Sequence, residues 1–234
     1  MEREALLENI RVWRARIDEA AAKWGGATIC GVSKTVDPET INMAWDGGIR
    51  VLGENRVQEL LGKIDRLNPD YELHLIGRLQ TNKVKSIIDR VDMIQSLDRD
   101  ALAEEISRRA VTANRVMPVL VQVNIAAEPQ KAGVAEEELL PFIHRAAALP
   151  GLRIRGLMAI MPIADDPGDV RPYFRRMRGW FDRLKDMDIP GVDMEVLSMG
   201  MSDDCVVAAE EGATMVRLGR ALFGARAAAT ITKE

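Results

Sequence analysis

Hydrophobic residues along the chain recur in two patterns that follow one another. Residues 2–24 carry apolar side chains every three or four positions, with charged residues between them, which predicts a long amphipathic helix. From residue 28 onward, short runs rich in β-branched residues alternate with segments of helical periodicity. Eight runs predict strands, at 28–34, 49–55, 72–77, 92–98, 116–125, 154–160, 194–200 and 214–219. The helical segments between them lie at 38–48, 56–67, 81–90, 99–114, 135–149, 170–187 and 202–212.

This strict alternation predicts parallel strands joined by crossover helices. Eight such repeats within 234 residues match the size and the strand number of a TIM barrel. An open doubly wound sheet is the alternative, but it more often has about five or six strands. No linker or low-complexity segment indicates a second domain. We therefore expect residues 1–234 to form a single α/β domain, a (β/α)8 TIM barrel with an extra N-terminal helix.

Composition excludes several other classes of protein. The net charge of −4 argues against a dominant nucleic-acid surface. Cys30 and Cys205 form neither a disulfide framework nor a metal-binding pair, and Cys30 is expected in the core. His74 and His144 are too isolated to predict a metal site. The charged N-terminus lacks the apolar stretch of a signal peptide or membrane span, so we expect a soluble cytoplasmic protein without membrane partners.

Polar residues follow several of the predicted strands, where a TIM barrel carries its chemistry. Lys34, Asn55, Asn124 and Arg217 are expected to point into the barrel mouth. Taken alone, a lysine after a strand indicates only that the strand ends at the surface. A partly buried lysine beside other cations is, however, suited to Schiff-base chemistry with a carbonyl group.

The last two repeats carry a candidate phosphate site. In "SMGMSDDC", Gly200 permits a tight turn and Ser202 is a good helix N-cap, so an ordinary capped helix is one interpretation. The other is an anion site made of helix N-terminal amides and the serine hydroxyl. Gly219, in "VRLGRALFG", would let the backbone approach a ligand closely. The loops after strands seven and eight of TIM barrels frequently bind phosphate, which favours the anion site.

A phosphate site and a reactive lysine at one barrel mouth suggest pyridoxal 5′-phosphate as the cofactor. Its aldehyde would meet Lys34, and its phosphate would lie on Ser202 and Gly219. Arg217 would then face the pyridine nitrogen. Because an arginine cannot accept a proton, it would keep that nitrogen unprotonated and weaken the ring as an electron sink.

Seven motifs in this order give the sequence a specific resemblance to a known family. They are "GVSKT", "GENRVQE", "LHLIGRLQTNK", "VQVNIAAEPQKAGV", "RGLMAI", "LSMGMSDD" and "MVRLGRALFG". Together, over about residues 28–226, they resemble the pyridoxal phosphate homeostasis proteins. The resemblance implies a single TIM barrel similar to the N-terminal domain of alanine racemase.

The resemblance also implies roles for individual residues. Pyridoxal phosphate would be bound to Lys34, its phosphate by Ser202, and its pyridine nitrogen would face Arg217. Gly219 and Arg220 would offer backbone amides to the phosphate. Arg220 departs from the Thr or Ser of many relatives and could add charge near the phosphate. Arg56 departs from the commoner "GENY", and Asn55 in the same motif is a further candidate contact to the cofactor.

Three functions are compatible with such a site. The first is a non-catalytic carrier that holds pyridoxal phosphate reversibly on Lys34 for vitamin B6 homeostasis. The second is an amino-acid racemase of low activity, which lacks here the β-rich second domain and its catalytic tyrosine, because Tyr71 and Tyr173 do not end a strand. The third, a class I aldolase, is disfavoured by the inward Arg217 and by the motif set. We expect the carrier, as a monomer, with apo-enzymes that use the same cofactor as candidate partners.

Overall fold

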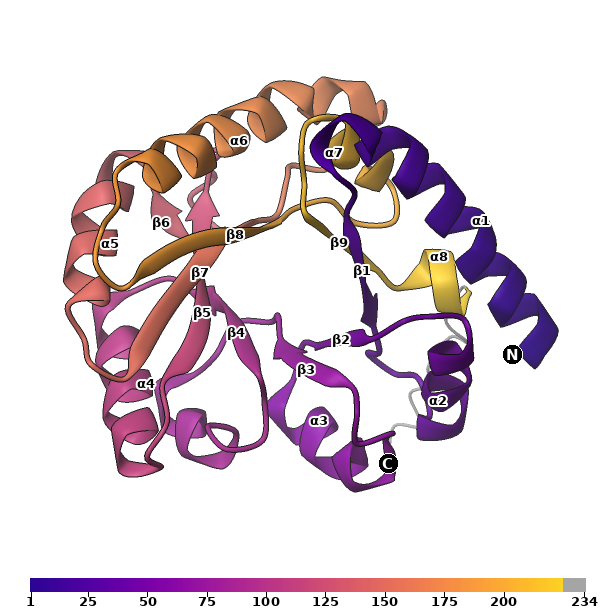
Figure 1. Cartoon of the computed structure of the whole chain (residues 1–234), viewed down its shortest axis with the longest axis horizontal. Coiled ribbons are helices and arrows are strands. Elements are labelled where there is room, and N and C mark those ends of the chain that lie inside the picture. Colours follow the sequence, from indigo (N-terminus) through magenta and orange to yellow (C-terminus); the bar gives the residue numbers. More distant parts are fainter. Residues whose placement is uncertain (225–234) are drawn as a thin grey trace.

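The computed structural model describes residues 1–224, and its centre is a closed barrel of parallel strands (Figure 1). The barrel strands are β1 (Thr28–Val32), β2 (Val51–Glu54), β3 (Glu72–Leu75), β4 (Met93–Leu97), β5 (Met117–Asn124), β7 (Leu152–Ala159), β8 (Val192–Ser198) and β9 (Met215–Leu218). Pairing of β1 with β9 and of β4 with β5 closes the ring. The prediction of an eight-stranded TIM barrel is therefore confirmed. The expected single domain extends to residue 234, and residues 225–234 lie outside the described part.

Each of the eight predicted runs overlaps one barrel strand. The sequence did not predict β6 (Val134–Ala135), a two-residue strand that pairs with the end of β5 outside the ring. A strand of two residues is too short to show an alternation of apolar and polar positions, so the sequence contains no pattern that predicts it.

Helices cover the outside of the barrel, as the crossover connections require (Figure 1). They are α1 (Arg3–Ala21), α2 (Pro38–Asp46), α3 (Val57–Lys63), α4 (Asp100–Thr112), α5 (Leu139–Ala147), α6 (Arg171–Asp186), α7 (Cys205–Glu210) and α8 (Arg220–Phe223). In α6, the buried residues recur at helical spacing, so one apolar stripe faces the barrel and the arginines between face outward. Among these described helices, none is both long and apolar enough to cross a membrane.

The connection between β3 and β4 differs from the prediction. The expected α-helix over 81–90 is instead a 3-10 helix, Thr81–Ser86. Thr81, Val84 and Ile87 are β-branched, which lowers helix propensity, and the tighter 3-10 turns still bury Val84 and Ile87.

The predicted N-terminal helix is confirmed as α1, which continues into a 3-10 turn at Ala22–Trp24. Its apolar face buries Leu6, Ile10 and Ile17. It lies alongside α8 and near α2 and α7 (Figure 1). Asn9 donates from Nδ2 to the Leu222 carbonyl at 3.0 Å, which ties α1 to the short helix after the last strand. Because α8 has only four residues, α1 covers the side of the barrel that a longer last helix would cover.

Candidate functional site

A cavity of about 260 Å³ opens at the C-terminal ends of the barrel strands. Its lining comes from β1 and β9 themselves and from the segments that follow β1, β2, β3, β7, β8 and β9. The lining residues are Val32, Lys34, Asn55, Ile76, Ile160, Met201, Ser202, Asp203, Arg217, Gly219 and Arg220. The structure thus brings together all six residues that the sequence predicted as cofactor contacts.

Lys34 lies two residues beyond the end of β1, at the edge of this cavity. Its side chain is partly exposed, and its amine has no hydrogen-bond or ion-pair partner among the described residues. The next residue, Thr35, has a φ of 63°, which is rare for a β-branched residue. Its hydroxyl donates to the Lys34 carbonyl at 2.6 Å. A free amine on a tightly turned loop is therefore presented to the cavity.

Arg217, on β9, lies at the inner wall of the cavity and is 4% exposed. Its guanidinium donates to the Ser198 carbonyl at 2.8 Å, to Ser198 Oγ at 2.7 Å and to the Ala159 carbonyl at 2.8 Å. Burial lowers the pKa of Arg217, but a guanidinium remains charged near neutrality. These bonds fix a buried cation at the position that the sequence assigned to the cofactor ring.

The contacts of Arg217 continue into the barrel as a chain of buried polar side chains. Ser198 Oγ donates to Gln95 Oε1 at 2.7 Å, and Gln95 Nε2 lies 2.7 Å from His74 Nδ1. His74 Nε2 lies 2.8 Å from Glu72 Oε1, and the hydrogen bond from His74 is the main cause of the lowered pKa of Glu72. His74 is thus a core histidine with both ring nitrogens bonded, and it lies outside the cavity lining.

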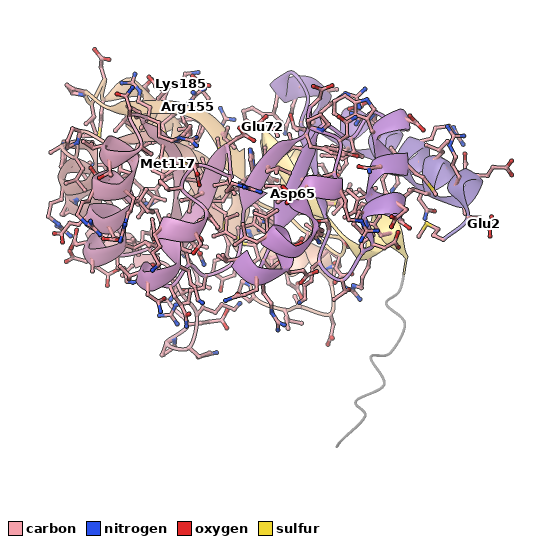
Figure 2. The ribbon with its side chains drawn as sticks, turned by 90° about the horizontal axis from the view of Figure 1, so that it is seen from below. Glu2, Asp65, Glu72, Met117, Arg155 and Lys185 are labelled. Atoms are coloured by element: carbon pink, nitrogen blue, oxygen red, sulfur yellow. The ribbon has the colours of Figure 1, made fainter. Side chains whose placement is uncertain are left out.

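Glu72 marks the far end of this chain. It begins β3, on the same side of the barrel as Arg155 and Lys185 in Figure 2. Since the mouth lies where the strands end, the polar chain runs through the barrel from the cavity wall to the opposite face.

Ser202 does not cap a helix, so the interpretation of this segment as an ordinary capped helix is wrong. Helix α7 begins only at Cys205, with Asp204 at the N-cap position. Asp204 instead accepts a hydrogen bond from the Met201 amide at 2.6 Å, which closes a turn around Ser202. Ser202 Oγ accepts from the Ala221 amide at 3.3 Å, so the hydroxyl joins the loop after β8 to α8 at the cavity wall.

Two glycines beside the cavity differ in what they require. Gly200 has a φ of +90°, as the predicted turn demands, and an added Cβ would meet Ala208 Cβ at 2.5 Å. An added Cβ at Gly219 would meet Val32 at 3.5 Å, an ordinary contact. A larger residue at position 219 would therefore fit against the rest of the protein. The place of Gly219 in the cavity lining favours close approach of a ligand as the reason for a glycine there.

Arg220 and Arg56 are the two residues that depart from the resembling family. Arg220 forms an ion pair with Asp203 at 2.6 Å, and both side chains are exposed. The charge that Arg220 was expected to bring to the phosphate is thus offset by a carboxylate on the rim. Arg56 lies outside the cavity, in a neighbouring hollow that it shares with Arg78 and Lys83.

Asn55 supplies an unsatisfied acceptor. Its Oδ1 is buried and has no hydrogen-bond partner among the described residues, while its backbone amide donates to Glu54 Oε1 at 2.7 Å. Buried polar atoms are nearly always paired, so this oxygen requires a donor from a ligand or a water.

Asn124, by contrast, was expected at the mouth and is not in the cavity lining. Its amide group binds the backbone of Glu128 and closes a turn, so the prediction for Asn124 is wrong.

The sequence missed the residues that hold the site from behind. Glu54 and Lys63 are buried beneath the Lys34 loop, and Ser198 and Gln95 support Arg217. The glutamate belongs to the "GENR" motif and Lys63 follows it on the next helix. Lys63 falls on the same face of its helix as Val57 and Leu60, and this position was the one available signal in the sequence.

The fold and the site together define a (β/α)8 barrel with a ligand cavity and a free lysine at its mouth. The sequence matches the family described as "Alanine racemase, N-terminal domain" over residues 2–227. It is 47% identical over 216 residues to the pyridoxal phosphate homeostasis protein of Aquifex aeolicus, covering 90% of this chain and 94% of that protein. Identity to the protein of the same name from Escherichia coli K12 is 37% over 231 residues, which cover 94% of this chain and 97% of that protein. The chain belongs to the family of pyridoxal phosphate homeostasis proteins.

Solved structures agree with this assignment. PipY of Synechococcus elongatus PCC7942, solved with pyridoxal phosphate bound, superposes with a TM-score of 0.83 at 33% identity, covering 94% of this chain and all of that one. Alanine racemase from Corynebacterium glutamicum gives a TM-score of 0.71 at 18% identity, and the match covers 96% of this chain and 61% of the racemase. The second likeness concerns the fold alone.

Proposed function

We propose that this chain binds pyridoxal 5′-phosphate at the barrel mouth, holds it reversibly as a Schiff base on Lys34, and serves vitamin B6 homeostasis in the cytoplasm. One observation carries the proposal: an unpartnered lysine amine, a buried arginine, a serine hydroxyl and a glycine backbone converge on one cavity. The PipY structure, with pyridoxal phosphate bound in a barrel 33% identical to this one, supports the same ligand.

The residues present fit the cofactor. The group, when bound, supplies an aldehyde carbon that condenses with a primary amine, forming a C=N bond and releasing one water. Lys34 provides the amine. Arg217 provides a fixed cation for the ring nitrogen, and Ser202 with the backbone at Gly219 and Arg220 provides donors for the phosphate. Asn55 Oδ1 remains as an acceptor for a donor on the ligand or on a bound water.

The composition of the cavity supports a carrier rather than an enzyme. Among the described residues that line it, none is a tyrosine, histidine or cysteine. Tyr71 is buried elsewhere, where its hydroxyl donates to the Ile41 carbonyl at 2.7 Å, and Tyr173 lies on α6. Asp203 is engaged with Arg220. A second acid or base opposite Lys34, which efficient racemisation needs, is therefore lacking from the described lining.

Reversible binding also suits an open site. A lysine at an open mouth can be displaced by another amine, so the cofactor could pass to apo-enzymes that require it. A monomer is sufficient for this role, because the six proposed contacts all come from one chain.

The test is an absorbance spectrum of purified protein mixed with pyridoxal phosphate, before and after borohydride, followed by peptide mapping. We expect one reduced adduct, on Lys34. An adduct on Lys83 or Lys131 instead would move the site, and no adduct on any lysine would refute the proposal.

A further inference from the structure

We propose that the buried ion pair of Lys63 and Glu54 positions the Lys34 loop, so that the Lys34 amine can reach the aldehyde of the bound cofactor. This inference rests on the proposed function. It assigns a positioning task to two residues that do not touch the cavity.

The pair lies directly behind the residue that precedes Lys34. Lys63 Nζ, on α3, is 2.5 Å from Glu54 Oε2, at the end of β2, and the residues are 6% and 1% exposed. Lys63 Nζ also donates to the Ser33 carbonyl at 2.8 Å, and Ser33 Oγ donates to Glu54 Oε2 at 3.1 Å. Both polar groups of Ser33 that face the pair are thus bound by it.

The residue that follows Lys34 is held by the same helix. The Thr35 amide donates to Glu59 Oε1, and the same oxygen lies 3.4 Å from Lys63 Nζ. Thr35 is the residue with a φ of 63°. A threonine leaves the common backbone regions only where its surroundings determine its conformation, and here Glu59 supplies the acceptor that does so. Lys34 is therefore flanked on both sides by backbone that α3 and β2 hold in place.

Stability alone is a weak reason for such an arrangement. Removing two charges from water costs so much that apolar residues often stabilise a core as well as a buried ion pair does. Apolar side chains, however, could not bind the Ser33 carbonyl, as Lys63 does, or the Thr35 amide, as Glu59 does. The charged groups therefore act on the position of the loop backbone, and through it on Lys34.

The same contacts keep Lys63 from reacting in place of Lys34. An ammonium group has three hydrogen-bond donors, and Lys63 meets three acceptors: Glu54, the Ser33 carbonyl and Glu59. These three contacts hold the Lys63 amine away from the cavity. The loop thus presents one free amine, that of Lys34, next to one that is fully engaged.

The test separates formation of the C=N bond from binding of the rest of the cofactor. Pyridoxal phosphate reports both, whereas pyridoxine 5′-phosphate, which has an alcohol in place of the aldehyde, reports binding only. For Lys63→Met we expect the rate of borohydride-trappable bond formation on Lys34 to fall about 10-fold to 100-fold, as displacement of a reacting group does. Affinity for pyridoxine phosphate should stay within a factor of about 2, because the proposed phosphate and ring contacts are untouched.

Three further variants guard the result. Lys63→Arg keeps the cation and should restore part of the rate. Glu54→Gln/Lys63→Met leaves no unpaired buried charge, so it should fold even where Lys63→Met does not, and should remain slow. Lys185→Met, which removes an exposed lysine at the end of α6, should match the wild type (Figure 2).

An unchanged rate in Lys63→Met or in the double variant would overturn the positioning role. An equal loss of pyridoxine phosphate binding would also overturn it, because it would show general damage to the site. If the wild type itself gives no adduct on Lys34, the proposed function fails and this inference with it. The wild-type control thus distinguishes the two failures.

Discussion

The guanidinium of Arg217 binds Ser198 twice, through the carbonyl at 2.8 Å and through Oγ at 2.7 Å. The first contact fixes the arginine to the backbone of β8. Through the second contact, Ser198 connects Arg217 at the cavity wall to the buried polar side chains inside the barrel. A single hydroxyl thus supports the residue proposed to face the cofactor ring.

Replacing Ser198 with alanine should reduce the free energy of unfolding by about 1–3 kcal/mol, because buried groups on Arg217 and Gln95 lose a partner. Urea unfolding measures the change. Thr112→Ala removes an exposed hydroxyl that binds the Arg108 carbonyl and should change stability by no more than about 0.5 kcal/mol. Equal effects of the two substitutions would contradict the importance of the buried contact.

Lys34→Ala should abolish the absorbance band that pyridoxal phosphate gives with the wild-type protein. Because the Lys34 amine has no partner among the described residues, the free energy of unfolding should change by no more than about 0.5 kcal/mol. Spectra and thermal unfolding of the same samples check both points. Lys83→Ala, in the neighbouring hollow, serves as the matched control and should keep the band. Persistence of the band in Lys34→Ala would place the bond on another lysine.

Ser202→Ala should weaken retention of pyridoxal phosphate by about 1.5–3 kcal/mol, the usual contribution of a hydrogen bond to a charged group. Competitive dialysis against an apo-enzyme measures the change. Arg220→Ser breaks the exposed ion pair with Asp203 and should alter retention by less than about 1 kcal/mol, since exposed pairs contribute little. A larger effect at Arg220 than at Ser202 would assign phosphate binding to the arginine.

Asp37 predicts a pH dependence of stability near the Lys34 loop. Its carboxylate caps α2 by accepting from the Thr40 amide at 2.8 Å, and this hydrogen bond lowers the pKa of Asp37. A carboxyl group with a lowered folded-state pKa stabilises the fold above its unfolded value, and the contribution is lost as pH falls through the folded value.

Asp37→Ala should therefore reduce stability by about 1 kcal/mol at neutral pH. The difference from the wild type should shrink as pH falls below about 4, where aspartate takes up its proton. Urea unfolding across this range measures it. Asp37→Asn keeps an uncharged acceptor and should show no such change with pH, so a parallel decline in both variants would rule out Asp37 as the titrating group.

Amino-acid turnover should be slow or undetectable. Holo-protein incubated with L-amino acids should transfer cofactor to an apo-enzyme acceptor without racemising them, because the one acid among the described lining residues, Asp203, is paired with Arg220. Chiral chromatography and acceptor activation measure the two processes. Racemisation at about 1 s⁻¹ or faster, within the ordinary range of enzymes, would favour the racemase alternative.

The barrel could be predicted from sequence because its signal repeats. In each βα unit the hydrophobic period changes from that of a strand to that of a helix. An error within one unit, such as the α-helix predicted over 81–90, therefore leaves the predicted topology intact. The six residues predicted as cofactor contacts line one cavity, because barrel topology brings the ends of distant strands together. The family resemblance, and not the topology, predicted the contact at Arg220.

At the site, the predictions that failed concern the local contacts of side chains rather than strand positions. Asn124 ends a strand as expected, but its amide completes a local turn. Ser202 lies at the cavity as expected, but the helix begins at Cys205. The Glu54–Lys63 pair joins a strand to the helix that follows it, and the chain behind Arg217 joins residues from different repeats. Hydrophobic periodicity does not identify the partners of such polar side chains.

The polar chain behind Arg217 also determines where the proton of His74 lies. Arginine only donates, so Ser198 Oγ accepts from Arg217 and gives its own hydrogen to Gln95 Oε1. Gln95 must then turn its NH₂ group toward His74 Nδ1, which has to accept. The hydrogen of the imidazole therefore lies on Nε2, which donates to Glu72. Every donor in the chain points the same way, from the cavity wall toward the far face of the barrel, so the Arg217 cation at one end selects a single tautomer of His74 at the other.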